Sequence, residues 1–237
     1  MKKVIIMFAA IVLFVGCKKE NLISLPVLSK TLTVNENYMI PAASKDPITY
    51  TSANEYAVQV SETGKITARH YTGVGTEVKL TSKDDSKSFV VHVAPRNTLY
   101  TEPNITFGQL KGTLSLNPNT LVSSVESADL YAMGGGADYL LVAYTSADRV
   151  DYYAVLVPLY NKGKLDIFLA DRYERIGTDN GVTYYRDALT ATEAKMMIAV
   201  EWFDYNGFSY WVAMYARYPH GRSCVEPLLS HCKGLLH

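Results

Sequence analysis

The stretch Val200-Glu201-Trp202-Phe203-Asp204-Tyr205-Asn206-Gly207-Phe208-Ser209-Tyr210-Trp211-Val212 decides the fold expected for the C-terminal half of the chain. Asn-Gly is the strongest short signal for a two-residue hairpin turn, because that turn needs positive φ at both central residues. It places Tyr205 opposite Phe208 and, counting outward, Trp202 opposite Trp211. The further predicted pairs are Val200/Ala213 and Ile198/Tyr215 on the tryptophan face, and Phe203/Tyr210, Glu201/Val212 and Ala199/Met214 on the other.

Both faces of this predicted hairpin are rich in apolar side chains, so each face needs a covering layer. The strands predicted around it cover 139–144, 150–160, 164–173, 182–186, 195–205 and 208–218. Asn161-Lys162-Gly163 is interpreted as a hairpin loop with the glycine in the left-handed conformation. A helix is expected over 120–133, capped by Asn119 and ended by Gly134. Residues 98–218 are therefore predicted to form an α+β domain, a helix packed on an antiparallel β-meander.

The N-terminal half shows short segments rich in β-branched and aromatic residues, separated by turn residues. These segments cover 31–34, 48–51, 57–60, 65–68, 77–80 and 89–93. Their spacing predicts a small all-β sandwich over residues 25–95. His70 and His92 fall in this region and are expected on its surface.

The same segments resemble the bacterial Ig-like group 2 (BIG2) domain. The resemblance rests on 31–34, on Ile48-Thr49-Tyr50-Thr51-Ser52-Ala53-Asn54 and on Gly64-Lys65-Ile66-Thr67-Ala68, with Gly73 and Gly75 in the following turn. Tyr50 stands where the family commonly has Trp. The resemblance implies an Ig-like sandwich that serves as a spacer or adhesive unit and has no catalytic residues.

The N-terminus has the order of a secretory signal: Met1-Lys2-Lys3, an apolar stretch over 4–15, and a small residue before Cys17. Leu13-Phe14-Val15-Gly16-Cys17 resembles the bacterial lipobox, with Phe14 at a position where Leu is usual. This resemblance implies a signal peptide over 1–16, lipidation of Cys17 and a tether over 17–24. The apolar stretch is shorter than the roughly 20 residues of a spanning helix. A membrane span and an ordinary signal peptide are the alternatives.

Charge and cysteine content narrow the class of partner. The chain has 23 Lys and Arg against 23 Asp and Glu, so it carries no electrostatic footprint for nucleic acid. Cys224 and Cys232 fall in the tail over 219–237, where a disulfide is permitted but not required. The tail also holds His220, His231 and His237, but it lacks the short paired spacings of a zinc site, so neither a metal nor a cofactor is expected.

The candidate binding residues surround the predicted hairpin. Trp202 and Trp211, with Tyr210 and Tyr215 nearby, could stack on a sugar ring while Glu201 and Asp204 bind its hydroxyl groups. The same aromatic pairs also stabilise sheets without any ligand, as core residues. No nucleophile elbow, zinc-protease helix or phosphate-binding loop occurs, so no catalytic residue is assigned.

Together these patterns favour a non-catalytic protein of the cell envelope. It would be held by its lipid, in the outer membrane, facing either the periplasm or the cell surface. Its C-terminal domain would bind an envelope protein or a glycan, or serve in surface assembly. The alternative is a glycan-binding or glycan-active protein that uses the platform around Trp202 and Trp211. The overall pattern resembles small envelope lipoproteins of the Bacteroidetes type.

Overall fold

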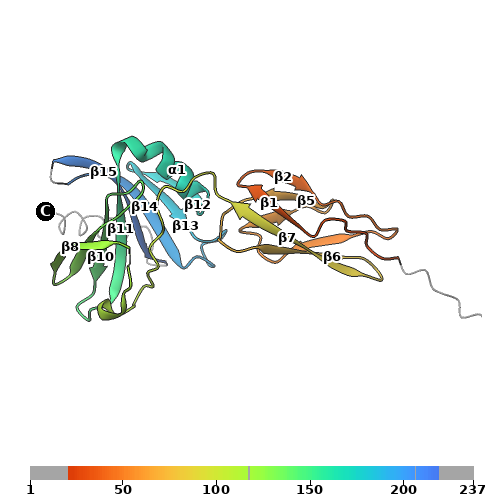
Figure 1. Cartoon of the computed structure of the whole chain (residues 1–237), viewed down its shortest axis with the longest axis horizontal. Coiled ribbons are helices and arrows are strands. Elements are labelled where there is room, and N and C mark those ends of the chain that lie inside the picture. The colour runs from red at the N-terminus through yellow and green to blue at the C-terminus, as the bar shows by residue number, and fades with distance from the viewer. Residues whose placement is uncertain (1–20, 117, 206, 219–237) are drawn as a thin grey trace, which may run out of the picture.

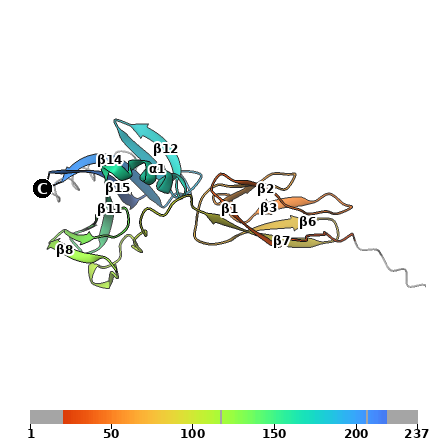
Figure 2. The same ribbon diagram turned by 45° about the horizontal axis from the view of Figure 1, so that its top comes forward.

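The computed structural model describes residues 21–116, 118–205 and 207–218, which form two lobes joined end to end (Figure 1). The described residues are mostly β with antiparallel sheets, as the sequence predicts, and they include one short α-helix. The N-terminal lobe contains β1 to β7, and the C-terminal lobe contains β8 to β15 and α1. Figure 2 shows the same two lobes after a 45° turn. The segment that follows residue 94, called the connector below, runs between them.

The N-terminal lobe consists of two sheets. The first sheet has the order β1 (Ser29–Thr33), β7 (Ser86–Ala94), β6 (Thr76–Thr81), β3 (Thr49–Ser52). The second has the order β2 (Asn37–Met39), β5 (Lys65–Ala68), β4 (Val58–Val60). All pairs are antiparallel except β1 with β7, which is parallel.

One apolar core lies between these two sheets. Leu32, Leu80 and Phe89 come from the first sheet and Ile66 from the second, and each is at most 1% exposed. In β6 buried and exposed residues alternate strictly, because one strand face meets the core and the other meets water. Alternation of this kind is what makes these strands recognisable in the sequence.

The C-terminal lobe is built on one eight-stranded antiparallel sheet, β12-β13-β14-β15-β11-β10-β9-β8. Its strands are β8 (Thr120–Val125), β9 (Ala128–Ala132), β10 (Tyr139–Tyr144), β11 (Val150–Pro158), β12 (Glu174–Asp179), β13 (Val182–Arg186), β14 (Met196–Tyr205) and β15 (Phe208–Arg217). Two four-stranded meanders meet where their last strands, β11 and β15, pair. The segment after β11 crosses from the middle of the sheet to its far edge.

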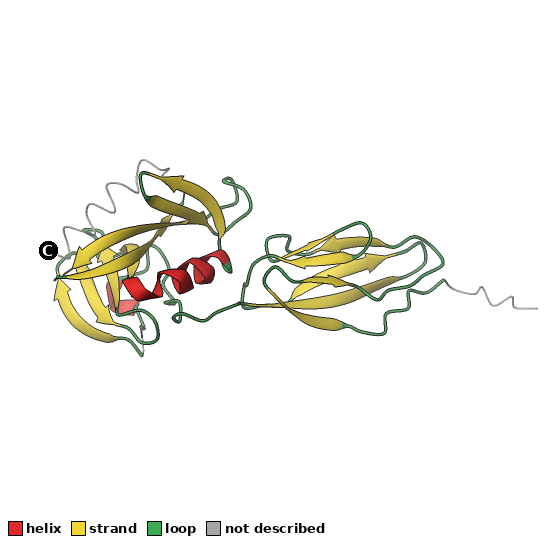
Figure 3. Ribbon diagram, turned by 90° about the horizontal axis from the view of Figure 1, so that it is seen from above, coloured by secondary structure: helices red, strands yellow, loops and turns green. Residues whose placement is uncertain are grey.

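That crossing segment contains α1 (Lys162–Ala170), which covers one face of the sheet (Figure 3). Leu165, Phe168 and Leu169 of α1 are fully buried against strand residues such as Val155 and Tyr215. A second apolar cluster, which includes Leu156 and Met214, occupies the opposite face and is formed by strand residues within the described chain. Both faces are therefore apolar, as the hairpin pattern predicts.

The helix predicted over 120–133 is wrong, because these residues form the hairpin of β8 and β9. Leu121, Val125, Ala128 and Ala132 fit a helical spacing, but the turn at 126–127 between the strands contains no glycine or asparagine that would reveal it. Gly134 accordingly ends no helix. The adjoining Gly135 has φ +79°, and a Cβ there would lie 2.9 Å from the carbonyl oxygen of Leu99.

The strand predicted over 164–173 is also wrong, since α1 occupies most of it. Leu165, Phe168 and Leu169 have the i, i+3, i+4 spacing of a buried helix face. The loop predicted at Asn161-Lys162-Gly163 is instead the start of that helix. The Asn161 side-chain amide donates to the carbonyl oxygen of Gly136 at 2.9 Å, so it joins the helix start to the loop before β10.

The predicted hairpin of β14 and β15 is confirmed in register. Tyr205 pairs with Phe208, Trp202 with Trp211, and every other predicted pair is present. Gly207 has φ +79°, as the turn requires, and Asn206 lies outside the described residues. The strands predicted at 139–144 and 182–186 are confirmed at those bounds.

Several sequence predictions concern parts of the chain that the structure does not describe. The signal peptide and residues 17–20 of the tether, Cys17 included, lie outside the described residues, as do Cys224, Cys232 and the three histidines of the tail. Within the described residues, no helix has the length and apolar character needed to cross a membrane.

Candidate functional site

The structure brings three of the predicted binding residues together on the α1 face of the sheet. Trp202 is 48% exposed, and Trp211 opposite it is partly buried. The ammonium group of Lys162 lies 4.6 Å from the centroid of the Trp211 ring. Asp204 is exposed on the same strand face as Trp202, and its carboxylate accepts a hydrogen bond from the Ser209 hydroxyl.

The other three predicted residues lie elsewhere. Tyr210 is 6% exposed in the apolar cluster on the opposite face of the sheet. Glu201, paired with Val212 of that cluster, is half-buried on the same opposite face. Tyr215 shares the tryptophan face but is fully buried beneath α1. The six side chains therefore do not form one platform.

Polar contacts around Asp171 join the two lobes. Asp171, at the end of α1, is fully buried, and its carboxylate accepts from the backbone and side chain of Arg96 at 2.5 and 2.7 Å. The carbonyl oxygen of Asp171 also accepts from the backbone N–H of Tyr71 at 2.6 Å. A buried carboxylate must be paired and hydrogen-bonded, and its partner here, Arg96, belongs to the segment that leaves the N-terminal lobe.

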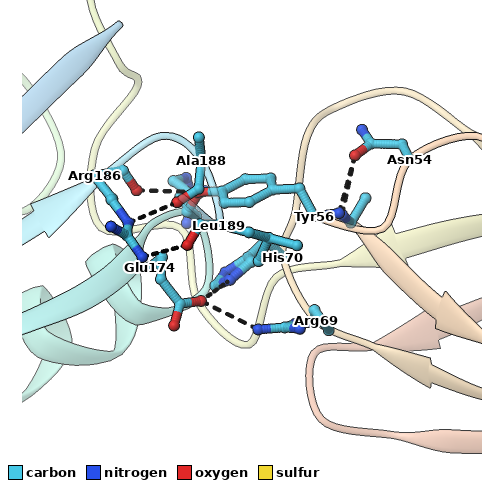
Figure 4. A network of polar contacts seen from close by, with 10 residues as sticks. Asn54, Tyr56, Arg69, His70, Glu174, Arg186, Ala188 and Leu189 are labelled. Carbon is cyan, nitrogen blue, oxygen red and sulfur yellow. Dashed lines mark hydrogen bonds and ion pairs between the residues drawn. The ribbon is translucent and has the colours of Figure 1, made fainter. Parts of the chain in front are cut away.

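A second set of contacts at the junction is drawn in Figure 4. The Tyr56 hydroxyl donates to the carbonyl oxygen of Arg172 at 2.6 Å, and its ring stacks on His70 at 4.4 Å between centroids. Glu174 binds His70 Nε2 at 3.1 Å and the Arg69 guanidinium at 3.3 Å. These contacts hold β12 and the end of α1 against the loops of the N-terminal lobe.

His70 is buried at this junction, with 7% of its surface exposed, so the prediction of a surface residue is wrong. Burial lowers the pKa of His70, and the hydrogen bond to Glu174 opposes that effect only in part. Within the described structure its Nδ1 atom is buried and has no hydrogen-bond partner. His92, in contrast, is exposed as predicted.

A cavity of about 650 Å³ opens beside this junction. Tyr71 lines it from the N-terminal lobe and Arg172 from the end of α1. The connector and the loops of the C-terminal lobe supply the remaining described lining residues: Thr98, Leu99, Tyr100, Thr101, Glu102, Pro103, Asn104, Ser115, Leu116, Pro118, Asn119, Met133, Gly134 and Gly135. Its size falls within the range of small-molecule sites, roughly 300 to 1,000 Å³.

The charged groups of this junction cavity are Glu102 and Arg172. Their Oε2 and Nε atoms are 3.4 Å apart. The guanidinium of Arg172 also lies between two rings, 3.8 Å from the centroid of Phe168 and 5.0 Å from that of Tyr71. This stacking orients the planar group toward Glu102.

Behind Glu102 lies a cluster of buried tyrosines. The Tyr173 hydroxyl donates to Glu102 Oε1 at 2.5 Å, and the hydroxyls of Tyr100 and Tyr215 are 2.7 Å apart. Tyr153 stacks on Tyr215 at 4.6 Å. Burial raises the pKa of Glu102, while Tyr173 and Arg172 partly offset it. A carboxyl group with a perturbed pKa in a cleft is a typical feature of a functional site.

No pattern in the sequence predicts this cavity. Glu102 and Arg172 are 70 positions apart, and Tyr71 belongs to the other lobe, so no local motif contains them. The only available signals are the abundance of tyrosine and Glu102-Pro103-Asn104 near the start of the predicted α+β domain. No model of a known protein family matches the chain, and no curated protein matches it in sequence.

Proposed function

We propose that this chain is a lipid-anchored protein of the cell envelope with a non-catalytic binding role. The N-terminal lobe, residues 25–95, acts as an Ig-like spacer of the BIG2 type. The C-terminal lobe, residues 98–218, is an α+β domain and carries the ligand site. The lipobox-like Leu13-Phe14-Val15-Gly16-Cys17 supports the anchor and, with it, an outer-membrane location.

The observation that carries the binding role is the junction cavity. Its charges balance, because Glu102 is paired with Arg172. Most of its remaining polar side chains are neutral hydroxyls and amides, such as Thr101, Asn104 and Asn119. A site of this kind suits an uncharged ligand with many hydrogen-bonding groups, because no net charge on the ligand has to be neutralised.

The same lining argues for binding and against catalysis of glycoside hydrolysis. That reaction ordinarily needs two carboxyl groups across the scissile bond. Among the described residues that line the cavity, Glu102 is the single carboxylate. Both of its oxygens are engaged, one by Tyr173 and the other by Arg172.

The second candidate is a glycan-binding or glycan-active protein that uses the aromatic hairpin. The exposure of Trp202 favours it, since a half-exposed indole offers a flat apolar face to a sugar ring. Asp204 lies on the same strand face and could accept hydrogen bonds from sugar hydroxyls. An envelope protein remains the alternative partner for either site.

Glycan arrays and envelope pull-downs with the purified protein would identify a ligand, and two variants would then locate its site. Thr101→Trp places an indole in the cavity from an exposed position and is expected to weaken binding at least about tenfold. Trp202→Ala is the matched variant for the hairpin and is expected to leave binding unchanged. Loss of binding only in Trp202→Ala would favour the second candidate, and no loss in either variant would contradict both.

The anchor has its own test. Cys17→Ser should abolish incorporation of a labelled fatty acid and release the protein from the membrane fraction, because the thiol is the group that is alkylated. Two or three acyl chains anchor a protein stably, at roughly 0.8 kcal/mol for each buried CH2. Unchanged labelling and membrane association in the variant would contradict lipidation at this residue.

A further inference from the structure

The outer edge of β8 has no strand partner among the residues that the structure describes. Within the described residues β8 pairs only with β9, so it forms one edge of the eight-stranded sheet. All six of its residues are exposed, and Leu121, Val122 and Val125 are 52 to 55% exposed. Such an edge presents unpaired backbone N–H and C=O groups, which are a template for another strand.

The opposite edge of the same sheet differs in its charges. β12 contains Glu174, Arg175 and Asp179, whereas β8, Thr120-Leu121-Val122-Ser123-Ser124-Val125, has no charged residue. Both strands contain one irregularity in register, so a bulge does not distinguish them. Charged side chains on an edge are a common protection against pairing with another chain. β8 lacks this protection and adds exposed apolar side chains.

We propose that β8 pairs with β8 of a second copy of this chain, antiparallel about a two-fold axis. In such a pair the residues at the two ends of the strand face each other, so Thr120 lies opposite Val125 and Leu121 opposite Ser124. No like charges meet. The same arrangement at β12 would place Glu174 opposite Asp179, and like charges directly opposite destabilise a sheet.

The choice of a second copy as the occupant follows from this charge pattern. A two-fold contact joins one patch to itself, so it requires a patch that is complementary to itself. An uncharged edge with apolar and hydroxyl side chains meets that requirement. The pairing would extend two eight-stranded sheets into one continuous sheet and remove Leu121, Val122 and Val125 from water. It is independent of the ligand proposed for the junction cavity.

Photo-cross-linking of the full chain tests this directly. p-Benzoylphenylalanine at Leu121 should give, on irradiation, a covalent product of twice the mass of the chain. The matched control carries the same group at Thr178, an exposed residue of β12, and should give none. Absence of the double-mass product from the Leu121 position, or an adduct there with another protein only, would overturn the proposal.

A charge variant provides a second, independent measurement. Val125→Lys places one lysine at each end of the proposed contact, and a lysine on an edge strand disfavours pairing with another chain. It should weaken self-association at least about tenfold in sedimentation experiments on the purified full chain. Thr178→Lys is the control and should leave self-association unchanged. Because both residues are exposed, the unfolding midpoint measured by tryptophan fluorescence should stay the same in both variants. Equal self-association of Val125→Lys and the unaltered chain would overturn the proposal.

Discussion

The two lobes bury their apolar side chains in different ways. The N-terminal lobe has one core between two sheets, and β6 alternates strictly between buried and exposed residues. The C-terminal lobe has two apolar clusters, one on each face of a single sheet, and β11 is buried at eight of its nine positions. Strands of the N-terminal lobe therefore show the two-residue alternation of apolar and polar residues in the sequence, whereas a strand buried on both faces, such as β11, does not.

Because their apolar cores are separate, the two lobes are expected to differ in their free energies of unfolding. The core of the N-terminal lobe is made by residues of that lobe, and no described side chain of the C-terminal lobe belongs to it. Among the described residues, the lobes meet mainly through polar contacts around Asp171, Tyr56 and Glu174. A domain with its own apolar core can in principle fold alone, so we expect each lobe to unfold by itself.

The largest expected effects come from deleting one core phenylalanine in each lobe. Phe89 and Phe168 are both fully buried, and Phe→Ala at such sites costs about 3 to 5 kcal/mol. Both tryptophans lie in the C-terminal lobe, so tryptophan fluorescence reports on that lobe alone. Phe168→Ala should lower the urea midpoint of the fluorescence transition, whereas Phe89→Ala should lower only a transition seen by circular dichroism.

The two phenylalanine variants serve as each other's controls. An equal shift of the fluorescence midpoint in both would show that the lobes unfold as one unit, which would contradict the separation inferred from their cores.

Asp171→Ala should weaken the connection between the lobes, with a smaller effect on stability. Removing one partner of a buried ion pair costs about 3 to 5 kcal/mol. The lower end of that range is expected, because Arg96 is 38% exposed and can be hydrated once its partner is gone. Unfolding followed by circular dichroism measures the loss.

Asp166→Ala is the matched control for the Asp171 variant. Asp166 lies on the same helix, 48% exposed, in an i,i+4 pair with Lys162. Its removal should cost only about 0.3 to 0.5 kcal/mol. A loss for Asp171→Ala no larger than this would show that the buried pair does not hold the junction.

The contrast between the lobes explains what the sequence could predict. The hairpin of β14 and β15 was predicted in register because its turn, Asn206-Gly207, is local and fixes every pair outward from it. The sequence of the β8–β9 hairpin predicts a helix instead, because its turn has no such residues and its apolar positions fit both periods. The sequence of α1 predicts a strand instead, since only Leu165, Phe168 and Leu169 mark its buried helix face.

The junction cavity could not be predicted from sequence spacing. Tyr71 and Arg172, which line it from the two lobes, are 101 positions apart, and Glu102 reaches Arg172 because the segment before it packs against α1. The aromatic hairpin suggested a platform, but the alternation of strand faces sends Tyr210 and Tyr215 into different apolar clusters. Local patterns fix pairs within a sheet, whereas contacts between elements depend on how the elements pack.

The buried tyrosines allow a test of how closely the C-terminal lobe is packed. Tyr215→Phe leaves the Tyr100 hydroxyl without its buried partner, at a cost of about 1 to 3 kcal/mol, and Tyr100→Phe does the same to Tyr215. The double variant should lose clearly less stability than the two single variants added together, because it leaves neither hydroxyl without a partner. Urea unfolding followed by tryptophan fluorescence measures all three. Losses that add within about 0.3 kcal/mol would contradict a shared hydrogen bond.

The smallest expected effect concerns pH and the contact between the lobes. Since burial lowers the pKa of His70 below its ordinary value of 6.5, the unfolded chain binds a proton in a pH range where the folded chain does not. The free energy of unfolding should therefore fall as pH decreases from 6.5 toward the pKa of folded His70, by at most about 1.4 kcal/mol per pH unit.

His70→Gln can still donate to Glu174 but does not titrate, so it should flatten this part of the stability profile. His92→Gln, at an exposed site, should leave the profile unchanged. If the two variants gave the same profile, the acid sensitivity would have to arise away from the junction, and His70 would act there only as a packing residue beneath Tyr56.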